Sequence, residues 1–333
     1  MHGFGHQAVL IFFVLSGYLV GGEIIRELRR GDFDWRVYAA KRLARLYAVY
    51  LAALLMGAFL DNIALRYFNR SAIYSADGQP FPMIFYSVAD RLHLETFVGN
   101  LVFCQTILVP TFGSNSPLWS LANEAWYYLL FPLVAWAVLT PGRSAKRGLC
   151  LALFAAGAWF VRGDILLYFS IWLPGLVPHG IGRPLCKSPW LPAAAIVASL
   201  AVIRFPWGRA VAGFVTDLGL AGLFVLLLNS LAYRNRPGGK SPPAHRLHRF
   251  LAGFSYSLYL MHWPLALFLS VALQQTFGFG HRMTFNLVGV MVYLGFLFLI
   301  YLSAWLLAAI TEHRTAWYRQ CLLRLFGASP AAP

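Results

Sequence analysis

The segment Lys41-Arg42-Leu43-Ala44-Arg45 separates two apolar runs, residues 8–22 and 46–60, and indicates how the chain is organised. Arg42 and Arg45 are three positions apart, so on a helix their side chains share one face. They would stand where the chain enters the second apolar run. Two guanidinium groups there form a fork-shaped site suited to phosphate. The alternative, which the spacing alone favours, is that they are ordinary basic residues flanking a membrane span.

The composition is that of an integral membrane protein. Of the 333 residues, 59% are hydrophobic and only 12% are charged, whereas a soluble domain carries about 25% charged residues. The formal charge of +15 would suggest nucleic acid as a partner of a soluble chain. Here the basic residues lie in short loops between apolar runs, which is typical of cytoplasmic loops. We therefore expect membrane lipid as a partner and no nucleic acid.

The apolar runs predict the fold class. Nine of them approach the length that a helix needs to cross a bilayer, about 17–25 residues. They are roughly residues 5–22, 42–60, 118–139, 148–162, 165–179, 189–203, 210–230, 252–274 and 283–311. The sequence therefore predicts an all-α polytopic transmembrane bundle of about nine spans, in one domain over residues 1–333. The four cysteines form no CxxC pair, and no His/Cys cluster has zinc spacing, so no metal site is expected.

Loop charge predicts the topology. Residues 94–110 are apolar but contain Glu95, Asn100 and Gln105, so they form either a tenth crossing or a re-entrant piece. If they do not cross, all the strongly basic loops fall on one side of the membrane. The positive-inside rule then favours nine crossings, with residues 61–92 outside and the C-terminus in the cytoplasm.

Two polar side chains inside the apolar runs are candidates for catalysis. Glu124 is a carboxylate within a span, and such a group indicates a functional site because its burial in lipid costs free energy. The alternative is a structural partner for an arginine or a tyrosine hydroxyl. His262 lies about ten residues into its run. Burying a neutral histidine costs less free energy than burying a carboxylate, so packing is its alternative role. Asp217 also lies within a span, but nothing near it forms a recognisable motif.

Four motifs together resemble the membrane acyltransferase-3 family. Residues 12–19, FFVLSGYL, are similar to the family's FFVLSGFL stretch, and Arg42-x-x-Arg45 is similar to its RxxR pair. Residues 119–132 resemble its WSLxxExxYYLLFP segment, and residues 255–264 resemble its SYSLYLxHWP segment. Each motif alone is loose, but the four occur in the family's order over most of the chain.

The resemblance implies an enzyme of the bacterial inner membrane with about ten helices. Such an enzyme moves an acyl group, often acetyl, from cytoplasmic acyl-CoA to a hydroxyl of an exported glycan or lipid-linked sugar. The resemblance also implies that Arg42 and Arg45 serve the acyl-donor side. Paired guanidinium groups there could bind the phosphates of coenzyme A. Acyl-CoA is then the donor substrate, and no bound cofactor is expected.

The catalytic base is where this chain departs from the family. The family's first helix and the histidine that ends it have no counterpart before residues 12–19. Acyl transfer to a hydroxyl needs a base, and histidine suits that role near neutral pH. We expect, in this order, that the chain starts late, that this form is inactive, or that His262 substitutes. His2, His6 and Glu124 complete the candidate catalytic residues.

A non-enzymatic polytopic protein is the alternative from another class. A glycan or lipid flippase, or another transporter, also uses polar residues within the membrane. An inverted repeat would favour transport, and the sequence shows none. A membrane scaffold would need neither the arginine pair nor Glu124.

Overall fold

The computed structural model describes residues 4–68, 74, 86–140, 145–204, 213–234, 244–278 and 286–328. These residues are predominantly helical and contain no strand, which confirms the predicted all-α class. Candidate His2 and the central part of the loop predicted at residues 61–92 lie outside the described residues.

Several helical segments are long and apolar enough to cross a membrane. By length and composition they are Gly5–Arg30, Trp35–Tyr67, Phe214–Tyr233, Ser255–Phe277 and Leu287–Leu325. The protein is therefore a multi-pass membrane protein. All nine predicted apolar runs coincide with helices, while the number of full crossings stays a prediction.

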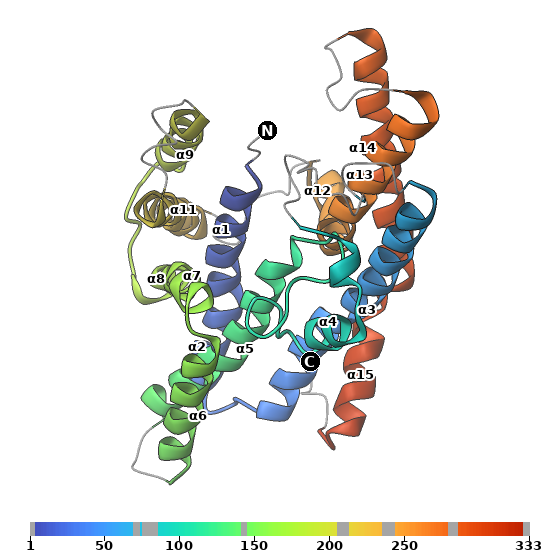
Figure 1. Cartoon of the computed structure of the whole chain (residues 1–333). Helices are drawn as coiled ribbons and strands as arrows, with labels where there is room; N and C mark the ends of the chain where they lie inside the picture. Colours follow the sequence, from blue (N-terminus) through green and yellow to red (C-terminus); the bar gives the residue numbers. More distant parts are fainter. Residues whose placement is uncertain are drawn as a thin grey trace. The chain divides into compact units, whose positions relative to one another are not determined.

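The helices group into two compact units, each described here by itself. Unit 1 comprises residues 1–33 and 123–241, and unit 2 comprises residues 34–122 and 242–333. The helices of unit 1 are α1 (Gly5–Ser16), α2 (Gly22–Arg30), α5 (Leu118–Leu139, from residue 123 on), α6 (Ala145–Val161), α7 (Asp164–Trp172), α8 (Val177–Gly180), α9 (Trp190–Arg204) and α11 (Phe214–Arg234). Helix α1 packs against both α7 and α11 (Figure 1).

Two of the predicted runs in unit 1 are interrupted helices. A π-helical turn, η1 (Gly17–Gly21), joins α1 to α2, and a 3-10 turn, η3 (Leu173–Leu176), separates α7 from α8. Pro174 and Pro178 explain the second interruption, because proline has no backbone N–H to continue a regular helix. Turns of the π type are frequent at functional sites.

Close packing of η1 on η3 explains the glycine of the FFVLSGYL stretch. A Cβ atom at Gly17 would lie 2.1 Å from the backbone oxygen of Trp172. A Cβ atom at Gly175 would lie 2.2 Å from the backbone oxygen of Val14. Small residues at such crossings let helix backbones approach each other closely, as is common between membrane helices.

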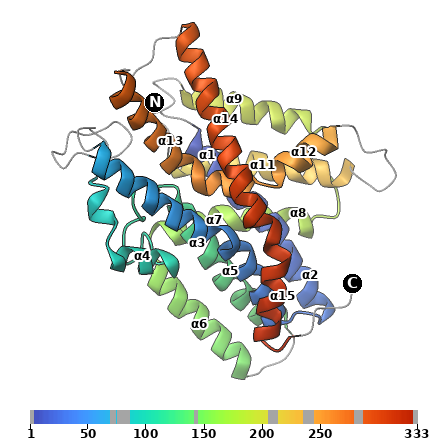
Figure 2. The same ribbon diagram turned by 90° about the vertical axis from the view of Figure 1, so that its right-hand side faces the viewer.

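Unit 2 is built around α3. Its helices are α3 (Trp35–Tyr67), α4 (Leu94–Leu101), α12 (Ala244–Ala252), α13 (Ser255–Phe277), α14 (Leu287–Ile310) and α15 (Thr315–Leu325). Helix α13 packs against α3 and α14, and α15 packs against α3 (Figure 2). The start of α3 is fixed by Asp34, whose carboxylate accepts hydrogen bonds from the backbone N–H groups of Arg36 and Val37 at 2.7 and 3.3 Å, as an N-cap residue does.

Residues 94–110 do not form a spanning helix. Helix α4 has eight residues, about 12 Å of rise, whereas the hydrocarbon core is about 30 Å thick. After it the chain turns irregularly, with positive φ at Phe103 and Thr106. The Asn100 amide donates to the backbone oxygens of Thr96 and Pro110 at 2.8 and 2.9 Å. Of the two predicted alternatives, the structure thus excludes a helical tenth crossing by this segment.

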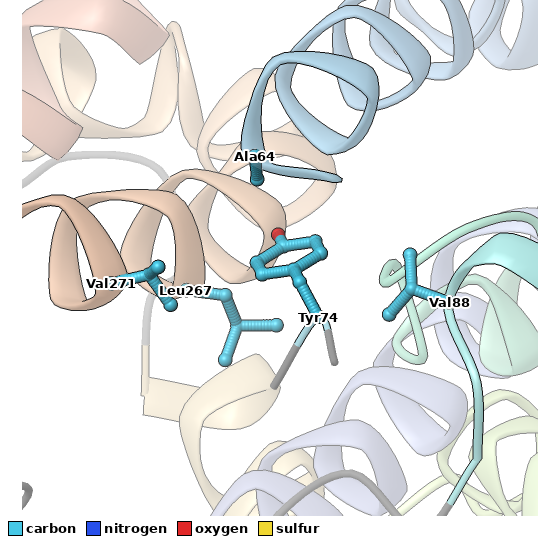
Figure 3. Packing of buried hydrophobic residues seen from close by; sticks show 5 residues of the cluster. All are labelled: Ala64, Tyr74, Val88, Leu267 and Val271. Carbon is cyan, nitrogen blue, oxygen red and sulfur yellow. The ribbon is translucent and has the colours of Figure 1, made fainter. Parts of the chain in front are cut away.

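Tyr74 packs near the C-terminal end of α3, at the opposite end of this helix from the arginine pair. Its ring is buried in a cluster with Ala64, Val88, Leu267 and Val271 (Figure 3). Its hydroxyl donates to the buried carboxylate of Asp61 at 2.9 Å. Burial and the neighbouring carboxylate both raise the pKa of the Tyr74 hydroxyl, so it keeps its proton and donates at neutral pH.

Candidate functional site

Arg42 and Arg45 lie on α3, about two to three turns from its start at Trp35, and therefore share a face as predicted. The Nη1 atom of Arg45 lies 3.3 Å from Oε1 of Glu312. The guanidinium carbon of Arg45 lies 5.0 Å from the ring centroid of Tyr256, and that of Arg42 lies 5.4 Å from the ring centroid of Tyr38. Cation–π contacts of this kind fix the plane of a guanidinium group.

Glu312 joins two of the sequence motifs, and sequence reasoning missed it. It is a buried carboxylate in the turn η4 (Glu312–Arg314) between α14 and α15. Its Oε2 atom accepts hydrogen bonds from the backbone N–H and the hydroxyl of Ser257 at 3.0 and 2.9 Å. Arg45 of the RxxR pair and Ser257 of the SYSLYLMHWP segment thus bind one carboxylate. The only signal in the sequence was an acidic residue at the end of the last apolar run.

Tyr256 links the same two motifs a second time. Its hydroxyl donates to the backbone oxygen of Leu46 at 3.1 Å, while its ring lies against the Arg45 guanidinium. The start of α13 is therefore tied to α3 beside the arginine pair. Arg45 keeps 46% of its side-chain surface exposed, so a ligand can reach it although its orientation is fixed.

Glu124 belongs to a buried polar network in unit 1. It lies on α5 and accepts a hydrogen bond from the hydroxyl of Tyr128, one turn further on. That hydroxyl is 3.4 Å from Oγ of Ser16, which in turn accepts a hydrogen bond from the indole N–H of Trp172 at 3.1 Å. The alternative role predicted for Glu124 was that of a structural partner for an arginine or a tyrosine hydroxyl, and the contact with Tyr128 fits it. A catalytic role for Glu124 stays a prediction.

His262 is held by its own helix. Its Nδ1 atom is 2.7 Å from the backbone oxygen of Tyr259 and 3.2 Å from that of Leu258. These oxygens can only accept, so Nδ1 carries the proton and donates. The arrangement fits the packing alternative, and a catalytic role for His262 stays a prediction.

His6 pairs with a carboxylate of another helix. Its Nε2 atom on α1 lies 2.8 Å from Oδ2 of Asp217 on α11. The ring of Tyr168 on α7 packs edge-on against the imidazole, with centroids 5.8 Å apart. Of the two candidate histidines in the described part of the chain, His6 is the one with a carboxylate as its hydrogen-bond partner.

The candidate residues divide between the units. His6 and Glu124 belong to unit 1, and Arg42, Arg45 and His262 belong to unit 2. Within the described ranges, no group of three or more His, Cys, Asp or Glu side chains is placed to hold a metal ion. The chemistry on offer is thus a guanidinium pair for an anion in one unit and a histidine–carboxylate pair in the other.

Helical segments able to span a membrane, together with these polar sites, define a multi-pass membrane protein with buried ionisable groups. Comparison with known families then identifies it more closely. The model of the family described as "Acyltransferase domain" matches residues 1–309. The chain belongs to this family, and the resemblance drawn from the four motifs is confirmed.

Two curated relatives match shorter segments. An uncharacterized protein of Haemophilus influenzae is 31% identical over 129 residues, which are 37% of this chain and 46% of that protein. A protein of Bacillus subtilis named putative peptidoglycan O-acetyltransferase YrhL is 29% identical over 135 residues, 39% of this chain and 19% of that protein. The chain therefore spans less than half the length of each of these relatives. No solved structure matches it significantly.

Proposed function

We propose that the chain is a membrane-bound O-acyltransferase. It moves an acyl group, most simply acetyl, from acyl-CoA to a hydroxyl of an exported glycan or lipid-linked sugar of the cell envelope. Membership of the acyltransferase family supports the reaction class. The name of the Bacillus subtilis relative supports a glycan as acceptor and acetyl as the group moved.

The observation that carries the proposal is the binding arrangement around Arg45. A carboxylate and an aromatic ring hold its guanidinium group on the same face of α3 as Arg42. Only Nη1 of Arg45 bonds to Glu312, and a guanidinium has further N–H groups that can donate to phosphate. Coenzyme A presents several phosphates, for which arginine is the preferred partner. The positive-inside rule favours a cytoplasmic position for this end of α3, on the side where acyl-CoA is available, and the membrane we propose is the bacterial inner membrane.

The transfer itself needs one proton to move. The acceptor hydroxyl oxygen attacks the thioester carbonyl carbon, the carbon–sulfur bond breaks, and the thiolate of coenzyme A leaves. A base takes the hydroxyl proton during the attack, and that proton ends on the thiol. Donors near the carbonyl oxygen stabilise the negative charge that develops there.

The test uses the full chain, purified in lipid nanodiscs, with acetyl-CoA as the probe. Replacing both Arg42 and Arg45 with Ala should weaken acetyl-CoA binding at least tenfold, because each charged hydrogen bond lost costs about 1.5–3 kcal/mol and about 1.4 kcal/mol is tenfold in affinity. Acetyl transfer to envelope glycan should fall in parallel. Arg45→Lys should be partly tolerated, because an ammonium cannot make the bidentate contact.

Arg66→Ala is the matched control. Arg66 lies exposed near the other end of α3 and contacts the ring of Tyr67, so the change removes an arginine from the same helix without touching the proposed site. Wild-type transfer by the double variant would overturn the donor site. Wild-type protein that neither binds nor hydrolyses acetyl-CoA would favour the non-enzymatic alternative.

A further inference from the structure

The connection between α3 and α4 carries a partly exposed arginine that has no acidic partner. Arg91 ends the 3-10 turn η2 (Ala89–Arg91). Its Nη1 atom donates a hydrogen bond to the hydroxyl oxygen of Thr111 at 3.0 Å. Within the described part of the chain this is the hydrogen bond that its guanidinium group makes, and it forms no ion pair with a carboxylate. A guanidinium group has five N–H donors, so most of them are available to a ligand.

Tyr86 holds this guanidinium group in a defined orientation. The guanidinium carbon of Arg91 lies 3.2 Å from the ring centroid of Tyr86. The hydroxyl of Tyr86 is in turn 2.8 Å from Oγ of Ser116, so the ring is fixed at its other end. Stacking on an aromatic face is a geometry that arginine favours, and the N–H groups lie in the guanidinium plane, where further acceptors can reach them. The result is an oriented cation beside the hydroxyl groups of Thr111 and Ser116.

Buried hydrogen bonds fix the backbone on which these partners stand. The N–H group of Ser114 donates to the buried carboxylate of Asp61 at 2.8 Å. The N–H group of Gly113 donates to the backbone oxygen of Arg91 at 3.0 Å, which ties η2 directly to residues 111–116. A binding site that is already ordered loses less entropy when its ligand arrives.

Arg91 is not needed to neutralise the buried acid of this region. Asp61 and Arg91 both lie close enough to Tyr86 to act on its hydroxyl. Asp61 accepts its hydrogen bonds from the hydroxyl of Tyr74 and the N–H of Ser114, which are neutral donors. Partial burial lowers the pKa of Arg91, because leaving water disfavours the charged form. An anion bound by Arg91 would offset that cost, since a cation removed from water is stabilised by an opposite charge.

Helix α3 sets this cluster apart from the proposed donor site in the same unit. About 24 Å of helix separates Arg45 from Asp61. With Arg45 at the cytoplasmic face, as predicted, Asp61 and Arg91 lie toward the outer face, where an exported glycan arrives. Envelope glycans that carry carboxylate or phosphate groups would meet a cation there, and their sugar hydroxyls would meet the hydroxyl groups beside it.

We propose that Arg91, Tyr86, Thr111 and Ser116 form a recognition site for an anionic group of the acceptor glycan, a carboxylate or a phosphate. The proposal rests on the acyltransferase function proposed above and adds to it that the acceptor is an anionic glycan. Two N–H groups of Arg91 donate to two oxygens of the anion, the geometry that guanidinium groups favour. The site takes no part in bond making. It holds a portion of the extended acceptor other than the hydroxyl that is acylated.

A purely structural arginine would tie η2 to residues 111–116 and nothing more. In Arg91→Gln an amide N–H can still donate to Thr111, but the charge is gone. We expect KM for the glycan to rise at least tenfold, the equivalent of one charged hydrogen bond, with little change in kcat or in acetyl-CoA binding. Arg91→Lys should keep part of the affinity because it keeps the charge, and binding by the wild type should weaken as salt is raised.

Arg66→Gln is the matched control. Arg66 is an exposed arginine at the same end of α3, and its guanidinium carbon lies 5.8 Å from the ring centroid of Tyr67. The change therefore removes one positive charge from the same region, and also from beside a tyrosine ring, without touching the proposed site. We expect wild-type KM for the glycan in this variant.

The experiment measures glycan binding by the full chain in phosphatidylcholine nanodiscs. The probe is glycan fragments from the envelope of the source cells, divided into three portions. One portion is untreated, one has its carboxylates converted to amides with carbodiimide, and one has its phosphate esters cleaved with hydrofluoric acid. Wild-type affinity should fall at least tenfold after at least one treatment, and Arg91→Gln should not distinguish that portion from the untreated one, because the two changes remove the same interaction.

The outcomes separate this proposal from the function on which it rests. Wild-type protein that binds none of the portions or all three equally, or Arg91→Gln that binds untreated glycan as well as the wild type does, overturns the site. An effect of Arg91 that appears only in phosphatidylglycerol nanodiscs would assign the anion to a lipid headgroup and would also overturn it. If Arg91→Gln fails to insert, the response of the wild type to the two treatments and to salt decides. Glycan binding that depends on Arg91, without acetyl transfer, would refute the proposed function alone.

Discussion

Replacing Glu312 tests whether one buried carboxylate holds the arginine pair in place. It accepts two short hydrogen bonds from Ser257 and a longer one from Arg45. A hydrogen bond to a charged group contributes about 1.5–3 kcal/mol. The pair with Arg45 adds at most about 1 kcal/mol, because Arg45 is nearly half exposed and its charge is screened by water.

Two variants separate these contributions. Glu312→Ala leaves the N–H and hydroxyl of Ser257 without their acceptor. We expect it to lower the free energy of unfolding by about 2–6 kcal/mol, which is about 1–3 kcal/mol for each buried donor left unsatisfied. Glu312→Gln keeps an oxygen that can accept from Ser257, but it removes the charge and turns an amide N–H group toward Arg45 in place of the acceptor. Because that pair is nearly half exposed, the cost in stability should be about 1 kcal/mol. Its effect should appear instead as weaker acetyl-CoA binding, since the Arg45 guanidinium loses the group that orients it.

Unfolding in mixed detergent micelles, followed by tryptophan fluorescence, measures the first effect, and titration with acetyl-CoA measures the second. Glu95→Gln is the control, because Glu95 is an exposed carboxylate on α4 of the same unit. A Glu312→Ala variant as stable as the wild type would contradict the contacts assigned to this carboxylate. A Glu312→Gln variant with unchanged donor binding would show that Arg45 needs no such orientation.

The remaining predictions concern packing and topology. Gly17→Ala should destabilise the protein by about 1–3 kcal/mol or more, because its Cβ would lie 2.1 Å from the backbone oxygen of Trp172. Gly57→Ala, where nothing lies within 4 Å of the new atom, is its control in thermal unfolding, and equal effects would contradict the packing argument. In a cysteine-free background, Asp90→Cys should react with an impermeant maleimide from outside the cell and Arg30→Cys only after lysis. Labelling of both from outside would overturn the predicted topology.

Much of the fold could be predicted because it depends on local properties of the sequence. Apolar runs long enough to span a bilayer must be helical, since every backbone polar group in lipid needs an internal partner. The runs therefore gave the helices, including the limits of residues 118–139, which match α5. The apolar runs did not reveal where a helix is interrupted by a π-helical or 3-10 turn. The π-turn after Ser16 depends on how closely η1 packs on η3, and that contact is not a property of the segment itself.

The sequence predicted several residues of the candidate site, but it did not predict which side chains they contact. The spacing of Arg42 and Arg45 was enough to place both on one face of a helix. The partner of Arg45 lies 267 residues away in the sequence, and no local pattern marks Glu312. The partner of His6 is likewise 211 residues distant. The sequence marks Asp217 only as an acidic residue within an apolar run, because its hydrogen-bond partner lies on another helix.

Buried acidic groups in this chain share one physical requirement, and they meet it in different ways. A carboxylate taken out of water needs donors or a cation, or its desolvation destabilises the fold. Asp61 and Glu124 accept hydrogen bonds from tyrosine hydroxyls, which are neutral donors. Asp217 is bound by the imidazole of His6 on the neighbouring helix. Glu312 takes two hydrogen bonds from Ser257 and a cation, Arg45, as its third partner. Each carboxylate therefore has the donor or cation that its burial requires, and in every case that partner comes from outside the turn that carries the acid or from the next turn of its helix.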